Sequence, residues 1–261
     1  MNEHYDQIRE KSGAFYSTQT MQSNTENPSD GLRQHNLALR DTLSAIIDRN
    51  NFDLLDIGCG RGRICRIIRD VFPQSRISGI DISAEQIERA RSFLSDAVFE
   101  IGNEISFPFS DNSFDYATCR MSIHHYPDMI NHLREVKRVL RPGGYYLVID
   151  PVPSPGLQDY WLNKVFLDAE HETSGDGHIK FYTLEEYSHF LAELGLTMAR
   201  RELLPHSVTW SKATDYNMSI YNSILSAPDE FRIAINFADE GDHYRYDLPT
   251  QVLGILKPEQ E

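Results

Sequence analysis

Cysteine is scarce in this chain, which has three cysteines among 261 residues. None belongs to a Cys-x-x-Cys pair, so neither a disulfide framework nor a cysteine zinc site is expected. This usage is typical of a protein in a reducing compartment, and we expect a cytoplasmic location. The length and the ordinary apolar share of 40% suit one α/β domain with a cap.

Positive charge and long apolar runs are also lacking. The chain has 25 Lys and Arg residues against 39 Asp and Glu residues, a formal net charge of −14. Because binding to a phosphate backbone depends on clustered basic side chains, nucleic acid is not an expected partner. No apolar run approaches the ~20 residues of a membrane span, and the N-terminus has no basic-then-apolar signal. The sequence therefore predicts no membrane span.

What the chain does have is a glycine-rich stretch at residues 53–63. An apolar run that ends in Asp56 is followed by Gly58, Gly60 and Gly62, which predicts a buried strand, a tight turn and a helix start. Glycine there lets a ligand lie against the main chain. The spacing alone is weak evidence, because dinucleotide-binding loops use the similar pattern G-x-G-x-x-G. The carboxylate of Asp56 favours a cationic ligand over a pyrophosphate, and S-adenosylmethionine carries a cation and no phosphate.

Strands and helices alternate along most of the chain. The apolar patterns predict strands at residues 52–57, 76–81, 98–101, 114–119, 145–149, 196–204 and 250–256. They predict helices at residues 29–50, 63–72, 83–94, 128–140, 157–170, 183–194 and 211–235. Capping boxes open the helices at Ser83 and Thr183, and residues 141–144 are predicted to form a turn. Repeated strand–helix units imply a parallel, doubly wound α/β sheet.

Four motifs in order resemble one family, the class I S-adenosylmethionine-dependent methyltransferases, and within it the small-molecule group that includes ubiquinone and menaquinone biosynthesis. They are LDIGCGRG (55–62), GIDIS (79–83), FPFSDNSFD (107–115) and REVKRVLRPGG (134–144). The resemblance implies S-adenosylmethionine as cofactor, a small-molecule acceptor and a mostly parallel seven-stranded Rossmann-like sheet. Its last two strands are expected to form an antiparallel pair at one edge.

The resemblance also implies the residues that hold the cofactor. Asp81, with Ile82 beside it, closes the second strand about 20 residues past the glycines, where a carboxylate can accept both ribose hydroxyls. Asn103 and Glu104 follow the third strand where the family reads adenine, although Asn103 replaces the acid that is usual there. The further predicted contacts are Asp56, Gly58, Cys59 and Gly60 in the loop and Arg120 and Met121 after the fourth strand. Arg61 and Arg63 could meet the ligand carboxylate, but exposed arginines are more often solvated.

Histidines are the candidate catalytic residues. His124 and His125 follow the fourth strand, close to where the family points the transferable methyl group, and His178 is a second candidate from a later loop. One of them could take a proton from the acceptor, or they could only shape the cavity, and at most one of the adjacent pair can serve as the base. The spacing of His124, His125 and His171 does not support a metal site, so no metal is predicted.

The outer segments carry the predicted substrate specificity. Residues 1–50 are read as an N-terminal arm with a cap helix, and residues 51–150 as the cofactor-binding core. The polar first 28 residues could be a mobile arm or a lid whose aromatic side chains close over the ligand. Residues 151–182 are read as a substrate-covering insertion, and 183–261 as the remainder of the fold with a helical insertion at about 211–240. Aromatic side chains in these insertions suit an apolar or aromatic acceptor.

Two other functions stay open at this point. An oxidoreductase could bind NAD through the same turn, although the glycine spacing is one residue short and Asp56 suits a pyrophosphate poorly. A protein could also keep the cofactor site without methylating anything. The acceptor, the atom methylated and the oligomeric state are not predicted.

Overall fold

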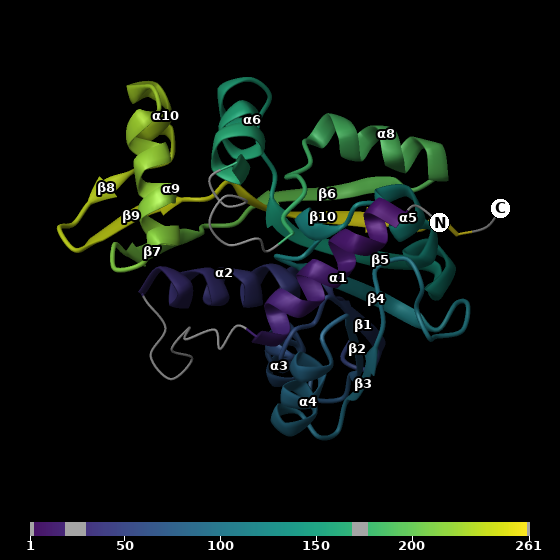
Figure 1. Cartoon of the computed structure of the whole chain (residues 1–261). Helices are drawn as coiled ribbons and strands as arrows, with labels where there is room; N and C mark the ends of the chain where they lie inside the picture. The colour runs from purple at the N-terminus through teal and green to yellow at the C-terminus, as the bar shows by residue number, and fades with distance from the viewer. Residues whose placement is uncertain (1–2, 19–29, 169–176, 260–261) are drawn as a thin grey trace.

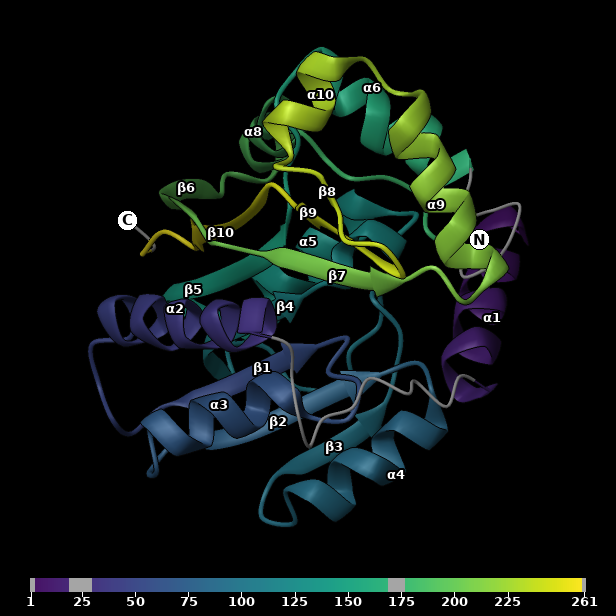
Figure 2. The same ribbon diagram turned by 90° about the vertical axis from the view of Figure 1, so that its left-hand side faces the viewer.

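A computed structural model describes residues 3–18, 30–168 and 177–259 of the chain (Figures 1 and 2). Its centre is a seven-stranded sheet in the order β3-β2-β1-β4-β5-β10-β6. The strands are β1 (Asp53–Ile57), β2 (Arg76–Asp81), β3 (Val98–Ile101), β4 (Phe114–Arg120), β5 (Leu140–Pro151), β6 (Thr197–Leu203) and β10 (Thr250–Leu256). Strands β1 to β5 pair in parallel, whereas β10 runs antiparallel to β5 and β6. The predicted fold is confirmed.

Helices cover both faces of this sheet (Figure 1). They are α2 (Asp30–Ile46), α3 (Arg63–Val71) and α4 (Ala84–Phe93) on one face, and α5 (Met129–Val139) and α8 (Leu184–Leu194) on the other. Leu43, Ile68 and Ile87 pack in the first apolar cluster, and Leu133 and Leu191 pack in the second. Because helices cover both faces, the central strands β1 and β4 are buried along most of their length.

The predicted helix starts depend on side-chain caps. Ser83 accepts a hydrogen bond from the Gln86 amide at the start of α4. Thr183 and Glu186 form a complete capping box on α8, which ends at Gly195 in the left-handed conformation. The turn predicted at 141–144 is wrong in detail, since these residues lie within β5 beside a register shift in its pairing with β4.

The N-terminal segment departs from the expectation of a mobile arm. Residues Glu3–Thr18 form the helix α1, on which Gly13 lies against Ile82 and Arg9 is buried. The apolar pattern of this segment is weak, so the contacts with the core decide its structure. Residues 19–28 and the side chains of Phe15 and Tyr16, which the lid hypothesis invoked, lie outside the described part.

The insertion before the last strand was predicted to be helical, but it contains both helices and strands. Helices α9 (Asp215–Ser226) and α10 (Asp229–Ala234) pack on a second sheet of order β7-β9-β8, built from β7 (Ser207–Ser211), β8 (Ala238–Asp239) and β9 (His243–Asp247). Trp161, from the π-helix η2 (Trp161–Phe166) that continues α6 (Leu157–Tyr160), joins their apolar cluster. Figure 2 shows this unit beside the main sheet. The sequence analysis missed the small sheet.

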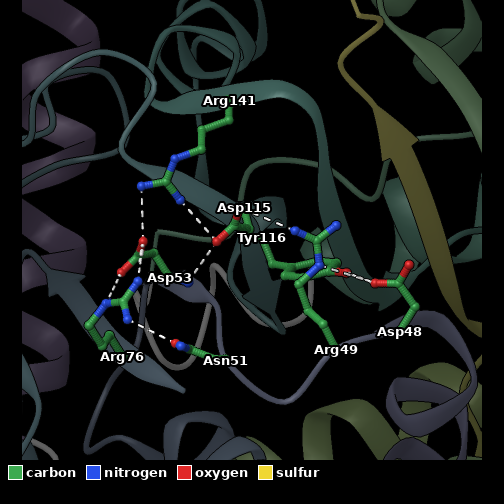
Figure 3. A network of polar contacts seen from close by, with 8 residues as sticks. All are labelled: Asp48, Arg49, Asn51, Asp53, Arg76, Asp115, Tyr116 and Arg141. Atoms are coloured by element: carbon green, nitrogen blue, oxygen red, sulfur yellow. Dashed lines mark hydrogen bonds and ion pairs between the residues drawn. The ribbon is translucent and has the colours of Figure 1, made fainter. Parts of the chain in front are cut away.

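A charged network ties together the amino ends of the central strands (Figure 3). Asp53 of β1 pairs with Arg76 of β2 and with Arg141 of β5, and Arg141 also pairs with Asp115 of β4. These contacts lie at the opposite end of the parallel strands from the glycine loop. They are therefore structural contacts and lie outside the candidate site.

Within the described ranges, no helix is long and apolar enough to cross a membrane.

Candidate active site

A cavity of about 360 Å³ lies beyond the carboxyl ends of β1, β2 and β4. All of the predicted cofactor contacts line it, namely Asp56, Gly58, Cys59, Gly60, Asp81, Ile82, Asn103, Glu104, Arg120 and Met121. These residues come from four separate segments of the chain, each at or just after the end of a strand. The parallel sheet brings them together because its strands all end at the same edge.

The glycine loop forms the floor of this cavity. Gly58, Gly60 and Gly62 all have positive φ angles, which are unfavourable for other residues. A Cβ atom on Gly58 would collide with the side chains of Ser122 and Tyr126, so this glycine is required by packing. A Cβ atom on Gly60 would meet nothing within 4 Å, so the space above Gly60 is open to a ligand.

Two aspartates stand at the strand ends beside the loop. Asp81 accepts hydrogen bonds from the backbone N–H groups of Gly60 at 2.8 Å and Ser83 at 2.9 Å, and burial raises its pKa. Asp56 is buried and accepts a hydrogen bond from Thr118 Oγ1 at 2.8 Å. Burial raises the pKa of Asp56 to about 7. Asp81 thus organises the loop, and Asp56 holds a charge that a cationic ligand would stabilise.

Basic side chains gather at another part of the cavity. Arg63 and Arg120 both line it. Burial, and to a smaller extent the charge of a neighbouring arginine, lowers the pKa of each guanidinium to about 10. Arg120 donates from Nη2 to Asn36 Oδ1 at 3.1 Å. His206 also lines the cavity, and its ring lies against that of His35 at a tilt of 35°, with centroids 4.3 Å apart. Sequence reasoning missed His206, which lies in no recognised motif. It left open whether Arg63 is solvated or meets the ligand, and the structure places Arg63 in the lining of the cavity.

The residues predicted to lie beside adenine are close to helix α1. Asn103 uses its Oδ1 to accept a hydrogen bond from the Ile105 amide at 3.1 Å. Glu104 is buried and accepts a hydrogen bond from Arg9 Nε at 2.7 Å. Arg9 itself lines the cavity and is 95 positions away in sequence, so no local signal could have identified it.

The three candidate histidines meet in space. His124 and His125 lie on the short 3₁₀ helix η1 (Ile123–His125), and the His178 ring lies 4.7 Å from that of His124 and 4.2 Å from that of His125 between centroids. One nitrogen from each lies within 4.8 Å of the other two. His125 lines the same cavity as the predicted cofactor contacts, although the sequence placed the pair on the acceptor side. His171 lies outside the described residues.

An aspartate missed by the sequence analysis completes this cluster. Nδ1 of His124 lies 2.9 Å from both carboxylate oxygens of Asp150, near the end of β5. Asp150 is buried, and burial raises its pKa. Burial lowers the pKa of His125 well below its ordinary value, so this imidazole is neutral near pH 7. Asp150 directly follows the predicted strand 145–149, and Asp56 and Asp81 likewise lie at the carboxyl ends of their strands, so that position was the available signal.

Comparisons with known proteins identify the family of this chain. A family model described as a methyltransferase domain matches residues 31–200. The chain is 34% identical to 27-O-demethylrifamycin SV methyltransferase of Amycolatopsis mediterranei over 70% of this chain and 69% of that protein. It is 28% identical to demethylmenaquinone methyltransferase of Desulfitobacterium hafniense over 59% of this chain and 70% of that protein. The crystal structure of YcgJ from Bacillus subtilis superposes with a TM-score of 0.70, at 22% identity over 86% of this chain and 99% of that chain.

The chain therefore belongs to the class I S-adenosylmethionine-dependent methyltransferases. Within this class it is similar to enzymes named for small-molecule acceptors, 27-O-demethylrifamycin SV and demethylmenaquinone. None of these comparisons supports the NAD-dependent alternative. Some other curated relatives are matched over only about half of their length.

Proposed function

We propose that the cavity holds S-adenosylmethionine with its ribose on Asp81, its adenine beside Asn103 and its carboxylate towards Arg63 and Arg120. The observation that carries this proposal is the convergence of all the sequence-predicted cofactor contacts on one cavity. The position of Asp56 beside the loop adds a negative charge that complements the sulfonium. The two arginines supply the positive charge that the ligand carboxylate needs.

The acceptor binds on the side of His124, His125 and His178. Methyl transfer from a sulfonium is an in-line displacement, so holding the acceptor atom, the methyl carbon and the sulfur in line supplies much of the rate. No covalent protein intermediate is required. Aromatic side chains near the cluster, such as Phe181 with its ring 5.0 Å from His124, support an apolar or aromatic acceptor. The relatives named for demethylmenaquinone and demethylrifamycin point to the same class of molecule. That one of the histidines removes a proton from the acceptor stays a prediction.

We also propose a cytoplasmic location. The three cysteines, Cys59, Cys65 and Cys119, are buried and form no disulfide, which suits a reducing compartment.

A calorimetric comparison of Gly60→Ala with Gly241→Ala tests the cofactor site. Both glycines have a positive φ and open space at the Cβ position, so both variants carry a similar backbone strain of about 1 to 2 kcal/mol. Only Gly60 lines the cavity. S-adenosylmethionine and S-adenosylhomocysteine should bind the parent and Gly241→Ala alike and bind Gly60→Ala more weakly, and NAD should bind none of the three. The proposal is contradicted if the parent binds NAD more tightly than S-adenosylmethionine. It is also contradicted if Gly60→Ala and Gly241→Ala bind S-adenosylmethionine with equal affinity.

A further inference from the structure

We propose that His124, His125 and His178 together bind one divalent transition-metal ion, such as Zn²⁺. The sequence predicted no metal, because the spacing of His124, His125 and His171 does not support a site, and His178 was considered only as a catalytic residue. The fold places one nitrogen of each ring within 4.8 Å of the other two, a convergence found among the residues that the structure describes. A tetrahedral site with metal–nitrogen distances of about 2.0 to 2.1 Å needs ligand nitrogens about 3.3 Å apart, so modest side-chain rotations complete it.

The backbone holds the two ligand-bearing loops together. The amides of Ile179 and Lys180 both donate hydrogen bonds to the carbonyl oxygen of His124, at 2.9 and 3.2 Å. These bonds fix the segment after His178 against η1. The cluster is therefore organised by main-chain contacts that do not depend on a metal, as a preformed site requires.

Asp150 supplies the outer contact that a metal-bound histidine normally has. Its carboxylate oxygens lie 2.9 Å from His124 Nδ1. A carboxylate that accepts the Nδ1 proton leaves Nε2 with its lone pair and makes the imidazole a stronger ligand. The Phe181 ring packs against His124 and limits access of water on that side.

The donor set selects the type of metal. Three imidazole nitrogens with no carboxylate bound to the metal suit Zn²⁺, Fe²⁺, Co²⁺ or Ni²⁺ better than Mg²⁺ or Ca²⁺. Three protein ligands leave an open position, which is the arrangement of catalytic sites. A hydroxyl of the acceptor would occupy it, and the metal would lower the pKa of that hydroxyl before methyl transfer. This last role depends on the proposed methyltransferase function, whereas metal binding does not.

Titration of the chelator-treated protein with Co²⁺, followed by its ligand-field absorption, tests the site without any turnover. We expect one equivalent to bind and Zn²⁺ to displace it. His178→Ala and His178→Gln should each weaken binding by ~100-fold or more, and Asp150→Asn by ~10- to 100-fold. His189→Ala removes an exposed histidine outside the cluster and should bind as the parent does. Thermal melts confirm that the compared variants are folded, and the two His178 variants guard against a folding defect in either one.

Absence of a Co²⁺ spectrum at millimolar metal would overturn the proposal. Equal affinity in the parent and in either folded His178 variant would do the same. Calorimetry with S-adenosylmethionine on the metal-free protein separates the two proposals. Cofactor binding without Co²⁺ binding removes only the metal site, and Co²⁺ binding without cofactor binding removes only the proposed cofactor site.

Discussion

Asp81→Asn is the sharpest test of how the cofactor is held. In the structure each oxygen of Asp81 accepts one backbone N–H, from Gly60 on Oδ2 and from Ser83 on Oδ1. A carboxylate offers about four acceptor sites, so about two remain for the ribose hydroxyls. Because Asp81 holds two backbone N–H groups, we expect the substitution to loosen the glycine loop as well.

The size of the expected loss in cofactor affinity follows from these contacts. Asparagine keeps one acceptor oxygen but loses the charge, and its NH₂ group must face either a backbone donor or a ribose hydroxyl. Hydrogen bonds to charged groups are worth about 1.5 to 3 kcal/mol each. Losing the equivalent of one such bond, with some loosening of the loop, should weaken cofactor binding by about 2 to 3 kcal/mol, or ~30- to 150-fold in Kd.

The assay is titration calorimetry with S-adenosylhomocysteine, with Asp70→Asn as the matched control. Asp70 lies on the outer side of α3, is exposed, and pairs with Arg66 one turn away, so its loss should change affinity by less than twofold. A melting curve for each variant separates loss of binding from loss of fold. If Asp81→Asn binds S-adenosylhomocysteine as tightly as Asp70→Asn does, the ribose does not lie on Asp81.

Three further predictions follow from particular contacts. Burial raises the pKa of Asp56 in the folded protein to about 7, so the folded state favours the protonated carboxyl. This contribution to the free energy of unfolding is complete below the unfolded pKa near 4 and is lost as the pH rises through 7. Urea unfolding from pH 5.5 to 7 should therefore show a downward slope of up to about 1.4 kcal/mol per pH unit that Asp56→Asn removes, and an unchanged slope would contradict the assignment. Thr183→Ala should cost about 1 kcal/mol of unfolding free energy by removing the cap on α8, and a loss below 0.3 kcal/mol would show that the cap contributes little. Arg9→Ala should leave the buried Glu104 carboxyl without its arginine partner. Amide exchange across residues 3–18 should then accelerate and cofactor affinity should fall. Unchanged exchange would show that this pair does not hold α1.

The sequence alone determined the core of this protein. Apolar periodicity placed the central strands and their helices, because each strand is buried on both faces and each helix on one. The glycine loop, Asp81 and Asn103 could be located because parallel strands end at a common edge, so residues just after each strand become neighbours. The caps at Ser83 and Thr183 are local hydrogen bonds that the sequence specifies directly.

The tertiary structure alone decided which distant side chains complete the site. The Arg9–Glu104 pair joins residues 95 positions apart, and helix α1 is weakly apolar, so local sequence predicts neither. His178 reaches His124 because two backbone amides fasten its loop to η1. Such contacts depend on the paths of loops and insertions, which hydrophobic periodicity does not encode. For this reason the sequence could place the proposed cofactor contacts at one edge of the sheet, whereas the meeting of His178 with the other histidines and with Asp150 required the fold.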